Sequence, residues 1–253
     1  IAAAIALGIA WDLPVVGVCS LDAIAAEVQS RQPGAAVTVA TDARAGLIAV
    51  ASDTWAGITG TVAAAREARC HYFDLTEDVA ATQAIQRLAD GAPTAFMPQC
   101  GLAPGFIGIV AHHLAKGFDS VRDVQMRVGA LPAFPTNALK YNLTWSVDGL
   151  INEYCHPCEA IRGGRNIEVL PLEGLEHFSL DGTEYEAFNT SGGLGTLCET
   201  LAGRVKSLDY KSVRYPGHRD LMQFLLGDLG LKADQGNLKD IMRKSMPATM
   251  QDV

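Results

Sequence analysis

The stretch HYFDLTEDVAATQAIQRLADGAPTAFMPQCGLAPG, residues 71–105, decides the fold class of this chain. Its apolar pattern predicts a strand over 71–75, an amphipathic helix over 78–89 and a second strand over 94–97. A further helix is expected over Pro104–Lys116, because proline suits the first turn of a helix. Strands and helices that alternate in this way are typical of a parallel sheet covered by helices.

Weaker patterns extend on both sides of this stretch. Upstream, strands are expected at 14–18, 37–40 and 47–51, and helices at 2–10, 21–30 and 55–68. Downstream of about residue 120 the chain becomes rich in strands, with candidates at 121–131, 166–170, 175–180, 183–188 and 207–215. Short helices are expected at 147–154, 194–205, 219–229 and 238–244. The sequence therefore favours an α/β layer followed by an α+β domain.

The composition limits the classes of protein to which the chain can belong. The 253 residues carry a net charge of −8, and only 19% of them are charged. Nucleic-acid-binding domains usually have a basic face, so no nucleic-acid partner is expected. Six widely spaced cysteines are typical of reduced thiols, which favours a cytoplasmic protein.

The apolar stretch Ile1–Cys19 has about the length of a membrane span. However, Asp12 and Pro14 interrupt it, and neither a basic flank nor the positive start of a signal peptide precedes it. We interpret it as a buried helix followed by a strand, and we expect no membrane partner. Membrane insertion or export is the alternative.

Polar residues follow the strand expected at 71–75. In open parallel sheets ligands bind where the strands end, so Asp74, Thr76 and Glu77 are candidates for a site. Asp74 or Thr76 is equally suited to capping the next helix, because its side-chain oxygen can accept a backbone N–H bond. Both interpretations stay open at this point.

The loop from Cys100 to Gly105 also lies between a strand and a helix. Its two glycines allow the backbone to approach a ligand closely, and N–H groups at a helix start can anchor one. An ordinary tight turn explains these residues equally well. The loop Asn189–Gly195 is weaker evidence, because Cys198 stands where a G-x-G-x-x-G motif needs its last glycine.

Two further motifs and one missing motif bear on the function. Arg214 can hold a carboxylate through two parallel hydrogen bonds, although an isolated arginine on a strand is more often solvated. Cys155-His-Pro-Cys158 is a single CxxC pair, which suits a metal site or a redox pair, but the other ligands of a zinc site are lacking. Ordinary packing is therefore preferred over a redox role, and no metal is predicted. Residues 1–70 lack the G-x-G-x-x-G motif with which a Rossmann domain normally begins.

From about residue 47 to residue 253 the sequence resembles the saccharopine dehydrogenase family, most closely its lysine 6-dehydrogenase-like branch. The motifs follow one another in family order: HYFDLTED (71–78), PQCGLAPG (98–105), GALP (129–132), YNLTWS (141–146), EYEAFNTSGG (184–193) and RYPGH (214–218). The resemblance implies a partial Rossmann-like parallel sheet followed by an α+β substrate domain. It also implies that NAD or NADP oxidises the amine-bearing carbon of a small amino-acid substrate.

The resemblance also implies roles for single residues. Asp74 and Glu77 are the candidates for the catalytic base, which takes a proton from the substrate ammonium. The cofactor is expected to contact two residues at the end of the strand and the following glycine loop: Leu75, Thr76, Cys100, Gly101, Leu102, Ala103, Pro104 and Gly105. The substrate is expected to contact Tyr141, Trp145, Asn189, Thr190 and Arg214, with Arg214 holding its carboxylate.

The residue at position 190 bears on the choice of substrate. Relatives that bind saccharopine have an arginine where this chain has Thr190, and a buried carboxylate without a cation is costly. L-Lysine or a close diamino acid is therefore expected rather than saccharopine. Asp74, Glu77 or Glu186 would then meet the distal ammonium group.

Residues 1–50 resemble a different protein, the TsaB-type partner protein of the tRNA threonylcarbamoyladenosine system. The matching stretches are ALGIA (6–10), LPVVGVCSL (13–21) and TDARAG (41–46). The glycine-rich start of a saccharopine dehydrogenase is missing, and the chain stops where members of that family continue. A true fusion, an artefact of gene assembly and a diverged Rossmann half all remain open.

Together these resemblances predict three parts. Residues 1–50 are a TsaB-like or atypical segment, 51–120 the rest of a dinucleotide-binding domain, and 121–253 a shortened domain for substrate binding and dimerisation. The leading hypothesis is an amino-acid dehydrogenase that lacks its glycine-rich loop. The alternative is a non-catalytic fragment, or a fusion whose first segment binds a partner. Pairing of two copies into a homodimer is a further expectation.

Overall fold

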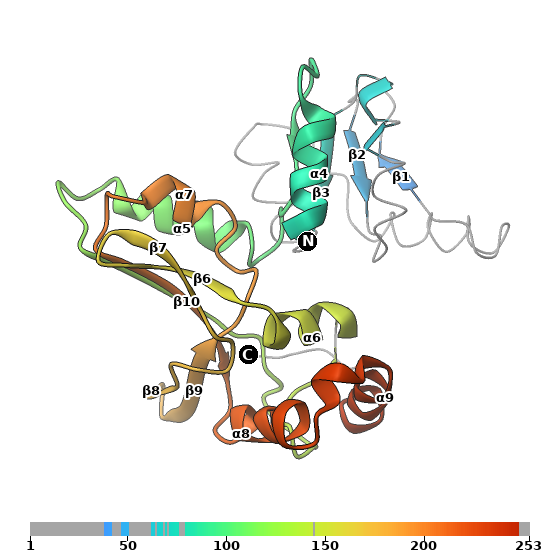
Figure 1. Cartoon of the computed structure of the whole chain (residues 1–253), viewed down its shortest axis with the longest axis vertical. Helices are drawn as coiled ribbons and strands as arrows, with labels where there is room; N and C mark the ends of the chain where they lie inside the picture. Colours follow the sequence, from blue (N-terminus) through green and yellow to red (C-terminus); the bar gives the residue numbers. More distant parts are fainter. Residues whose placement is uncertain are drawn as a thin grey trace, which may run out of the picture. The chain divides into compact units, whose positions relative to one another are not determined.

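The structure is a computed structural model that describes residues 38–41, 47–50, 62–63, 65–67, 69, 71–75, 79–143 and 145–247. The chain divides into two compact units, Ile1–Val110 and Ala111–Val253, and each unit has a sheet of its own (Figure 1). The helices and strand expected at 2–10, 14–18 and 21–30 lie outside the described residues.

The first unit contains a four-stranded sheet. Its strands follow the chain order, β1 (Thr38–Thr41), β2 (Leu47–Val50), β3 (His71–Asp74) and β4 (Phe96–Met97). β1 runs antiparallel to β2, whereas β2, β3 and β4 are parallel to one another. The parallel pairs confirm the α/β class expected from the alternation of strands and helices.

The helix α4 (Val79–Ala89) connects β3 to β4. Ala81 and Ile85 are four residues apart and both are buried, as expected for the apolar face of an amphipathic helix. Ile85 packs in a small core with Val62, Ala65 and Tyr72. The ring of Tyr72 also stacks on Phe96, with 5.8 Å between the ring centroids. This core fixes the end of β3, where the first candidate site begins.

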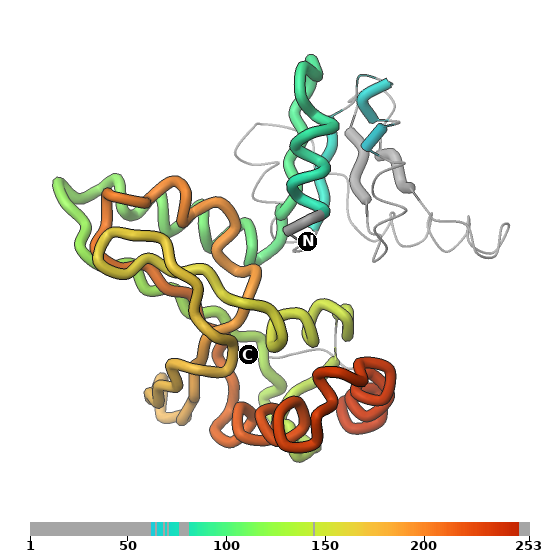
Figure 2. Tube along the Cα trace, in the orientation of Figure 1, coloured from blue at the N-terminus to red at the C-terminus, as the bar shows by residue number. Residues whose placement is uncertain are grey.

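The second unit contains a six-stranded sheet built around β10 (Ser207–Arg214). β5 (Asp123–Val128) pairs in parallel along one edge of β10. On the other edge, β6 (Cys158–Arg162) pairs with the first residues of β10 and β9 (Thr183–Asn189) with its last residues, both antiparallel. The hairpin partners of β6 and β9 are β7 (Arg165–Val169) and β8 (Glu176–Leu180), and the chain path of both hairpins can be followed in Figure 2.

Helices complete the second unit. They are α6 (Val147–Cys155), α7 (Leu197–Leu201), α8 (His218–Gln223) and α9 (Gln235–Ser245). α8 continues into a π-helical turn at Phe224–Asp228 and a 3-10 turn at Leu231–Ala233. Residues of α6, α8, α9 and β9 share one core, which includes Leu150, Tyr154, Phe188, Met222 and Met242. In the part of the chain that the structure describes, no helix is long and apolar enough to cross a membrane.

Three expectations about the elements need correction. The strand β6 was not predicted, because the residues Cys-Glu-Ala-Ile-Arg have no strong strand composition. They form a strand by pairing with β7 and β10. The helix expected at 194–205 is only Leu197–Leu201, since the chain turns through glycines on both sides. The helix α5 (Phe106–Ala115) begins after Pro104 rather than at it.

Candidate functional site

The end of β3 is tied to the loop that follows β4. The carboxylate of Asp74 is buried and accepts hydrogen bonds from Tyr72 Oη at 2.5 Å and from the backbone N–H of Gln99 at 3.2 Å. The backbone oxygen of Asp74 accepts from the N–H of Cys100 at 2.8 Å. The structure thus brings Asp74 and the Cys100 loop together and gives the carboxylate a structural role. Thr76 and Glu77 lie outside the described residues.

The Cys100–Gly105 loop folds back on itself. The N–H of Gly101 donates to Pro104 O, and the N–H of Phe106 donates to Gly101 O, both at 2.9 Å. Gly105 has a φ of +132°, and a Cβ there would lie 2.4 Å from Gly101 O, so this position requires glycine. The N–H groups of three successive residues, Gln99, Cys100 and Gly101, are therefore bonded within the protein.

This bonding decides what the loop can hold. A pyrophosphate is normally cradled by N–H groups that point at the ligand, and these N–H groups point elsewhere. The N–H groups of Gln99, Cys100 and Gly101 are therefore not available to the phosphates of a dinucleotide. Leu75 and Leu102 are 61% and 52% exposed, and they offer an apolar surface on which a flat ring could pack. The thiol of Cys100 is not a nucleophile at neutral pH, because burial and the charge of Asp74 raise its pKa to about 11.

Arg214 is the centre of a second group of candidates, in the second unit. It is the last residue of β10, it is buried, and its guanidinium carbon lies 4.5 Å from the centre of the Tyr141 ring. Its Nε donates to Tyr154 Oη at 3.0 Å, and Nη1 donates to the backbone oxygen of Val213 at 2.9 Å. Nη2 lies 3.5 Å from Glu153 Oε2, which is longer than a good hydrogen bond. The guanidinium is thus held firmly in one orientation.

A chain of hydrogen bonds continues from Arg214 into the core. Tyr154 Oη accepts from Arg214, so its own proton is available for His218 Nε2, which lies 3.0 Å away. His218 Nε2 then accepts, and Nδ1 carries the proton and donates to Leu139 O at 2.6 Å. Burial and the nearby Arg214 charge lower the pKa of His218 to about 3, which agrees with a neutral ring.

The loop before α6 covers this cluster. Trp145 Nε1 donates to Tyr141 Oη at 2.9 Å, and Tyr141 in turn stacks on Arg214. Trp145 and Tyr141 together form an aromatic cover over Arg214. Trp145 is 37% exposed whereas Tyr141 is buried, so the indole is the outer layer of this cover. Three of the five residues predicted to bind substrate, Tyr141, Trp145 and Arg214, are therefore in contact with one another or with a shared neighbour.

The other two predicted residues lie differently. Thr190 is buried, and its hydroxyl is 2.8 Å from that of Ser212, two residues from Arg214 on the same face of β10. Asn189 pairs with Lys211, so it lies on the opposite face of the sheet. Its amide donates to Leu170 O at 3.2 Å, in the turn between β7 and β8. The structure therefore brings Thr190 near the Arg214 cluster and does not bring Asn189 there.

The opposite face of the sheet carries charged residues in a network of their own. Arg127 pairs with Glu176 and, at 2.6 Å, with Asp209. Lys211 donates to Glu176 at 2.8 Å and to the backbone oxygen of Gly174 at 2.6 Å. These contacts join β5, β8 and β10, which supports a role in stability for this face.

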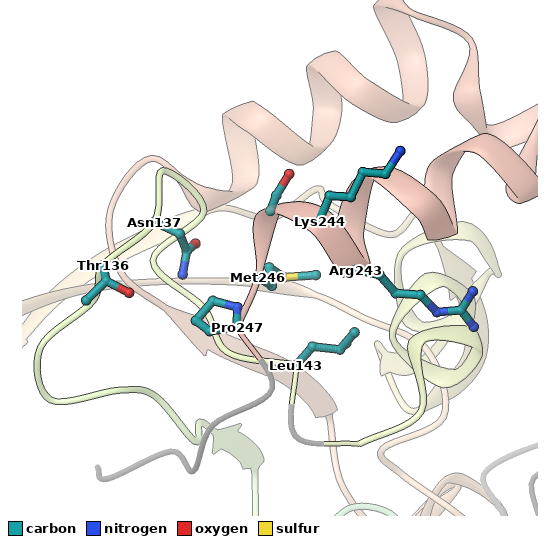
Figure 3. A pocket seen from close by; sticks show the side chains of 8 residues that line it. Thr136, Asn137, Leu143, Arg243, Lys244, Met246 and Pro247 are labelled. Carbon is teal, nitrogen blue, oxygen red and sulfur yellow. The ribbon is translucent and has the colours of Figure 1, made fainter.

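A pocket of about 490 Å³ opens near the C-terminal end of α9 (Figure 3). Its lining includes Asn137, Leu143, Arg243 and Met246. The amide of Asn137 donates to Tyr141 O at 2.9 Å, so one loop connects this pocket with the cover of Arg214.

Sequence reasoning missed three members of the Arg214 cluster, namely Glu153, Tyr154 and His218. One signal pointed to Glu153: it stands three residues after Leu150, on the apolar face of a predicted helix. The neighbouring Cys155 and Cys158 are buried free thiols. Burial raises the pKa of Cys158 to about 12, with the charge of Glu153 as a second cause. Among the described residues no group of three or more His, Cys, Asp or Glu could hold a metal ion.

Comparison with known proteins identifies the family. A family model described as saccharopine dehydrogenase C-terminal domain matches residues 101–250, more than half of the chain. This chain belongs to the saccharopine dehydrogenase family. A solved structure titled apo histidine-tagged saccharopine dehydrogenase (L-Glu forming), from Saccharomyces cerevisiae, is similar in fold, with a TM-score of 0.58 and 17% identity. The match covers 74% of this chain and 44% of that enzyme chain, so this member of the family spans less than half of the enzyme's length.

A second family model covers the first part of the chain. The model described as tRNA N6-adenosine threonylcarbamoyltransferase matches residues 1–140, which is also more than half of the chain. By this extent the chain belongs to that family as well, and the two matches share residues 101–140. The resemblance drawn from residues 1–50 is supported in part, because the matching family is the transferase and not the partner protein.

Proposed function

We propose that the second unit of this chain is the substrate-binding part of an amino-acid dehydrogenase, and that Arg214 binds the α-carboxylate of L-lysine or a close diamino acid. In the complete family enzyme the reaction would be the NAD- or NADP-dependent oxidation of a carbon that bears an amino group. The contribution of this chain is to bind and orient the amino acid.

The observation that carries this proposal is the state of the Arg214 guanidinium. A buried arginine is costly unless anions or hydrogen bonds compensate its charge. Nε and Nη1 are fixed by Tyr154 and Val213, while the anion nearest to Nη2 stands at 3.5 Å. The arginine is thus preorganised, and Nη2 is the guanidinium nitrogen that a substrate carboxylate would approach.

The proposed substrate follows from the residues around Arg214. Thr190 makes its contact with the hydroxyl of Ser212, and it supplies no cation for the second acid arm of saccharopine. Glu186 is no longer a good candidate for the distal ammonium. Its two carboxylate oxygens accept backbone N–H bonds from Gly217 at 2.9 Å and Arg219 at 2.6 Å.

Calorimetric titration of the chain with L-lysine and with saccharopine tests this function. We expect L-lysine to bind more tightly, and Arg214→Lys to weaken it by about 10–150-fold, the effect of losing a charge-assisted hydrogen bond. Arg127→Lys, on the opposite face of the sheet, is the matched control and is expected to bind lysine normally. Unchanged affinity in Arg214→Lys, or tighter binding of saccharopine, contradicts the proposal.

The match of residues 1–140 to the threonylcarbamoyltransferase family supports a second candidate function. In this alternative the first part of the chain binds a partner protein and the chain has no dehydrogenase activity. The two candidates differ in one simple property: the alternative requires no affinity for amino acids at Arg214.

A further inference from the structure

Among the residues that the structure describes, Glu153 is the anion that forms an ion pair with Arg214. It lies on α6 immediately before Tyr154, and its side chain is 11% exposed, compared with 5% for Arg214. The separation of 3.5 Å between Oε2 and Nη2 keeps the two charges adjacent without a good hydrogen bond. Any carboxylate that binds to the Nη2 edge of Arg214 must therefore come close to the carboxylate of Glu153.

The charges around Arg214 can be counted residue by residue. Arg214 is positive and Glu153 is negative, while His218 is neutral because its pKa lies near 3. Burial raises the pKa of the Tyr154 hydroxyl, so it is neutral too, and burial keeps the thiol of Cys158 protonated. Glu186, opposite Arg214 in the β9–β10 register, is a further buried carboxylate, and its two oxygens accept hydrogen bonds from the backbone N–H groups of Gly217 and Arg219 at the start of α8.

The Arg214–Glu153 pair itself therefore consists of one positive and one negative charge. A ligand that brings only a carboxylate leaves one excess negative charge in a buried site, which is costly. A ligand that brings a carboxylate and an ammonium on adjacent carbon atoms leaves the balance at zero. Its two charged groups need neighbouring partners of opposite sign, and Arg214 and Glu153 are such a pair.

We propose that Glu153 determines specificity in this site by binding the α-ammonium of the substrate while Arg214 binds its α-carboxylate. The site then selects α-amino acids over carboxylic acids that lack the α-amine. This inference rests on the proposed function, and it adds a residue to which the family motifs assign no role. If Glu153 only neutralises Arg214, its replacement changes stability and affects all carboxylate ligands in the same direction.

The test compares two ligands that differ only in the α-amine, L-lysine and 6-aminohexanoate, by calorimetric titration of the full chain. The wild-type chain is expected to bind L-lysine about tenfold more tightly or better, as one charge-assisted hydrogen bond would give. Glu153→Gln removes the charge. It is expected to weaken L-lysine binding, to strengthen 6-aminohexanoate binding and so to abolish most of the preference.

The control variant is Glu168→Gln, an exposed residue of β7, which is expected to keep the wild-type preference. Equal affinity of the wild-type chain for both ligands overturns the inference, and so does a Glu153→Gln variant that keeps the full preference. Failure of the proposed function is distinguishable, because the wild-type chain then binds neither ligand, and the inference falls with it.

Circular dichroism checks whether Glu153→Gln folds. If it does not, the inference is tested on the wild-type chain alone. A second ligand pair, L-norleucine and hexanoate, removes the distal amine and keeps the difference at the α-carbon. Preferential binding of L-norleucine by about tenfold supports the assignment of Glu153. Equal binding of the two overturns it.

Discussion

At the scale of single residues, His218 shows how one buried charge fixes the state of its neighbours. Arg214 Nε must donate, so the hydroxyl of Tyr154 must point its proton at His218 Nε2. A protonated His218 would place a second positive charge beside Arg214 and would offer Nε2 as a competing donor. The folded chain therefore keeps this imidazole neutral well below the pH at which a free histidine takes up a proton.

This predicts a pH dependence of stability. The pKa of His218 falls from 6.5 to about 3 on folding, through burial first and Arg214 second. Between these values the unfolded chain binds a proton that the folded chain does not bind. The free energy of unfolding is therefore unaffected by His218 above about pH 6.5 and decreases as the pH falls below it, by about 2.7 kcal/mol at pH 4.5.

Urea unfolding at pH 7.0, 5.5 and 4.5 measures this effect. His218→Gln is expected to be less stable at pH 7.0, because the bond to Leu139 O is lost, but to lose less stability on acidification. His177→Gln, at an exposed position of β8, is the control and should keep the wild-type dependence. An equally steep loss of stability in His218→Gln would show that other groups cause the acid sensitivity.

The residues of this cluster differ in how far the sequence could reveal them. Arg214 was predictable because it stands in a motif, and because an arginine beside a strand end suits a carboxylate. For Glu153 the sequence offered only its place on the apolar face of a predicted helix, and a glutamate on an amphipathic helix normally faces solvent. Only the packing of α6 against β10 makes Glu153 a buried partner of Arg214.

At the scale of elements, β10 serves two functions because successive side chains of a strand point to opposite faces. Ser212 and Arg214 face the aromatic cluster, whereas Asp209 and Lys211 face the network of ion pairs. Tyr210, on the face of Arg214, packs against the glycine turn after β9. A Cβ on Gly193 would lie only 2.2 Å from Cζ of its ring.

Gly193→Ala is therefore expected to destabilise the chain by about 1–3 kcal/mol, because the ring of Tyr210 or the turn must move. Gly236→Ala is the matched control. It lies in α9, where the nearest atom to an added Cβ is 3.8 Å away, and it is expected to stabilise the chain by about 0.5 kcal/mol. Urea unfolding of both variants measures the difference. Similar stability of the two would contradict the close approach of Gly193 to Tyr210.

Elements with a strong local pattern were predictable, and those that depend on distant partners were not. The alternation of apolar and polar residues correctly indicated β5, β8, β9 and β10, and helical spacing indicated α4, α6 and α9. β6 escaped prediction because it becomes a strand by pairing with β7 and β10. The helix expected at 219–229 is split, since α8 gives way to a π-helical turn at Phe224.

At the scale of the whole molecule, the two family matches suggest different functions for the chain. Residues 101–250 match the saccharopine dehydrogenase C-terminal domain, and residues 1–140 match the tRNA N6-adenosine threonylcarbamoyltransferase family. The parallel strands β2, β3 and β4 are compatible with a Rossmann-like sheet. The phosphate-binding motif that opens such a sheet is the feature on which a dehydrogenase depends, and residues 1–70 do not contain it.

The chain alone is therefore expected to bind NAD(H) and NADP(H) weakly or not at all. A dinucleotide is held mainly through its pyrophosphate, which needs close backbone approach and N–H groups that are free to point at it. Gln99 and Cys100 donate their N–H groups to Asp74, and Gly101 donates its own to Pro104, so these three groups are not free to bind a pyrophosphate. Calorimetric titration with each of the four nucleotides measures the affinity, with a dehydrogenase that has the glycine-rich loop as the positive control.

A dissociation constant in the micromolar range would contradict this expectation. Binding would then have to come from rearrangement of the Cys100–Gly105 loop or from the turn at Asn189–Gly195, and Gly193→Ala would separate these two by weakening only the second.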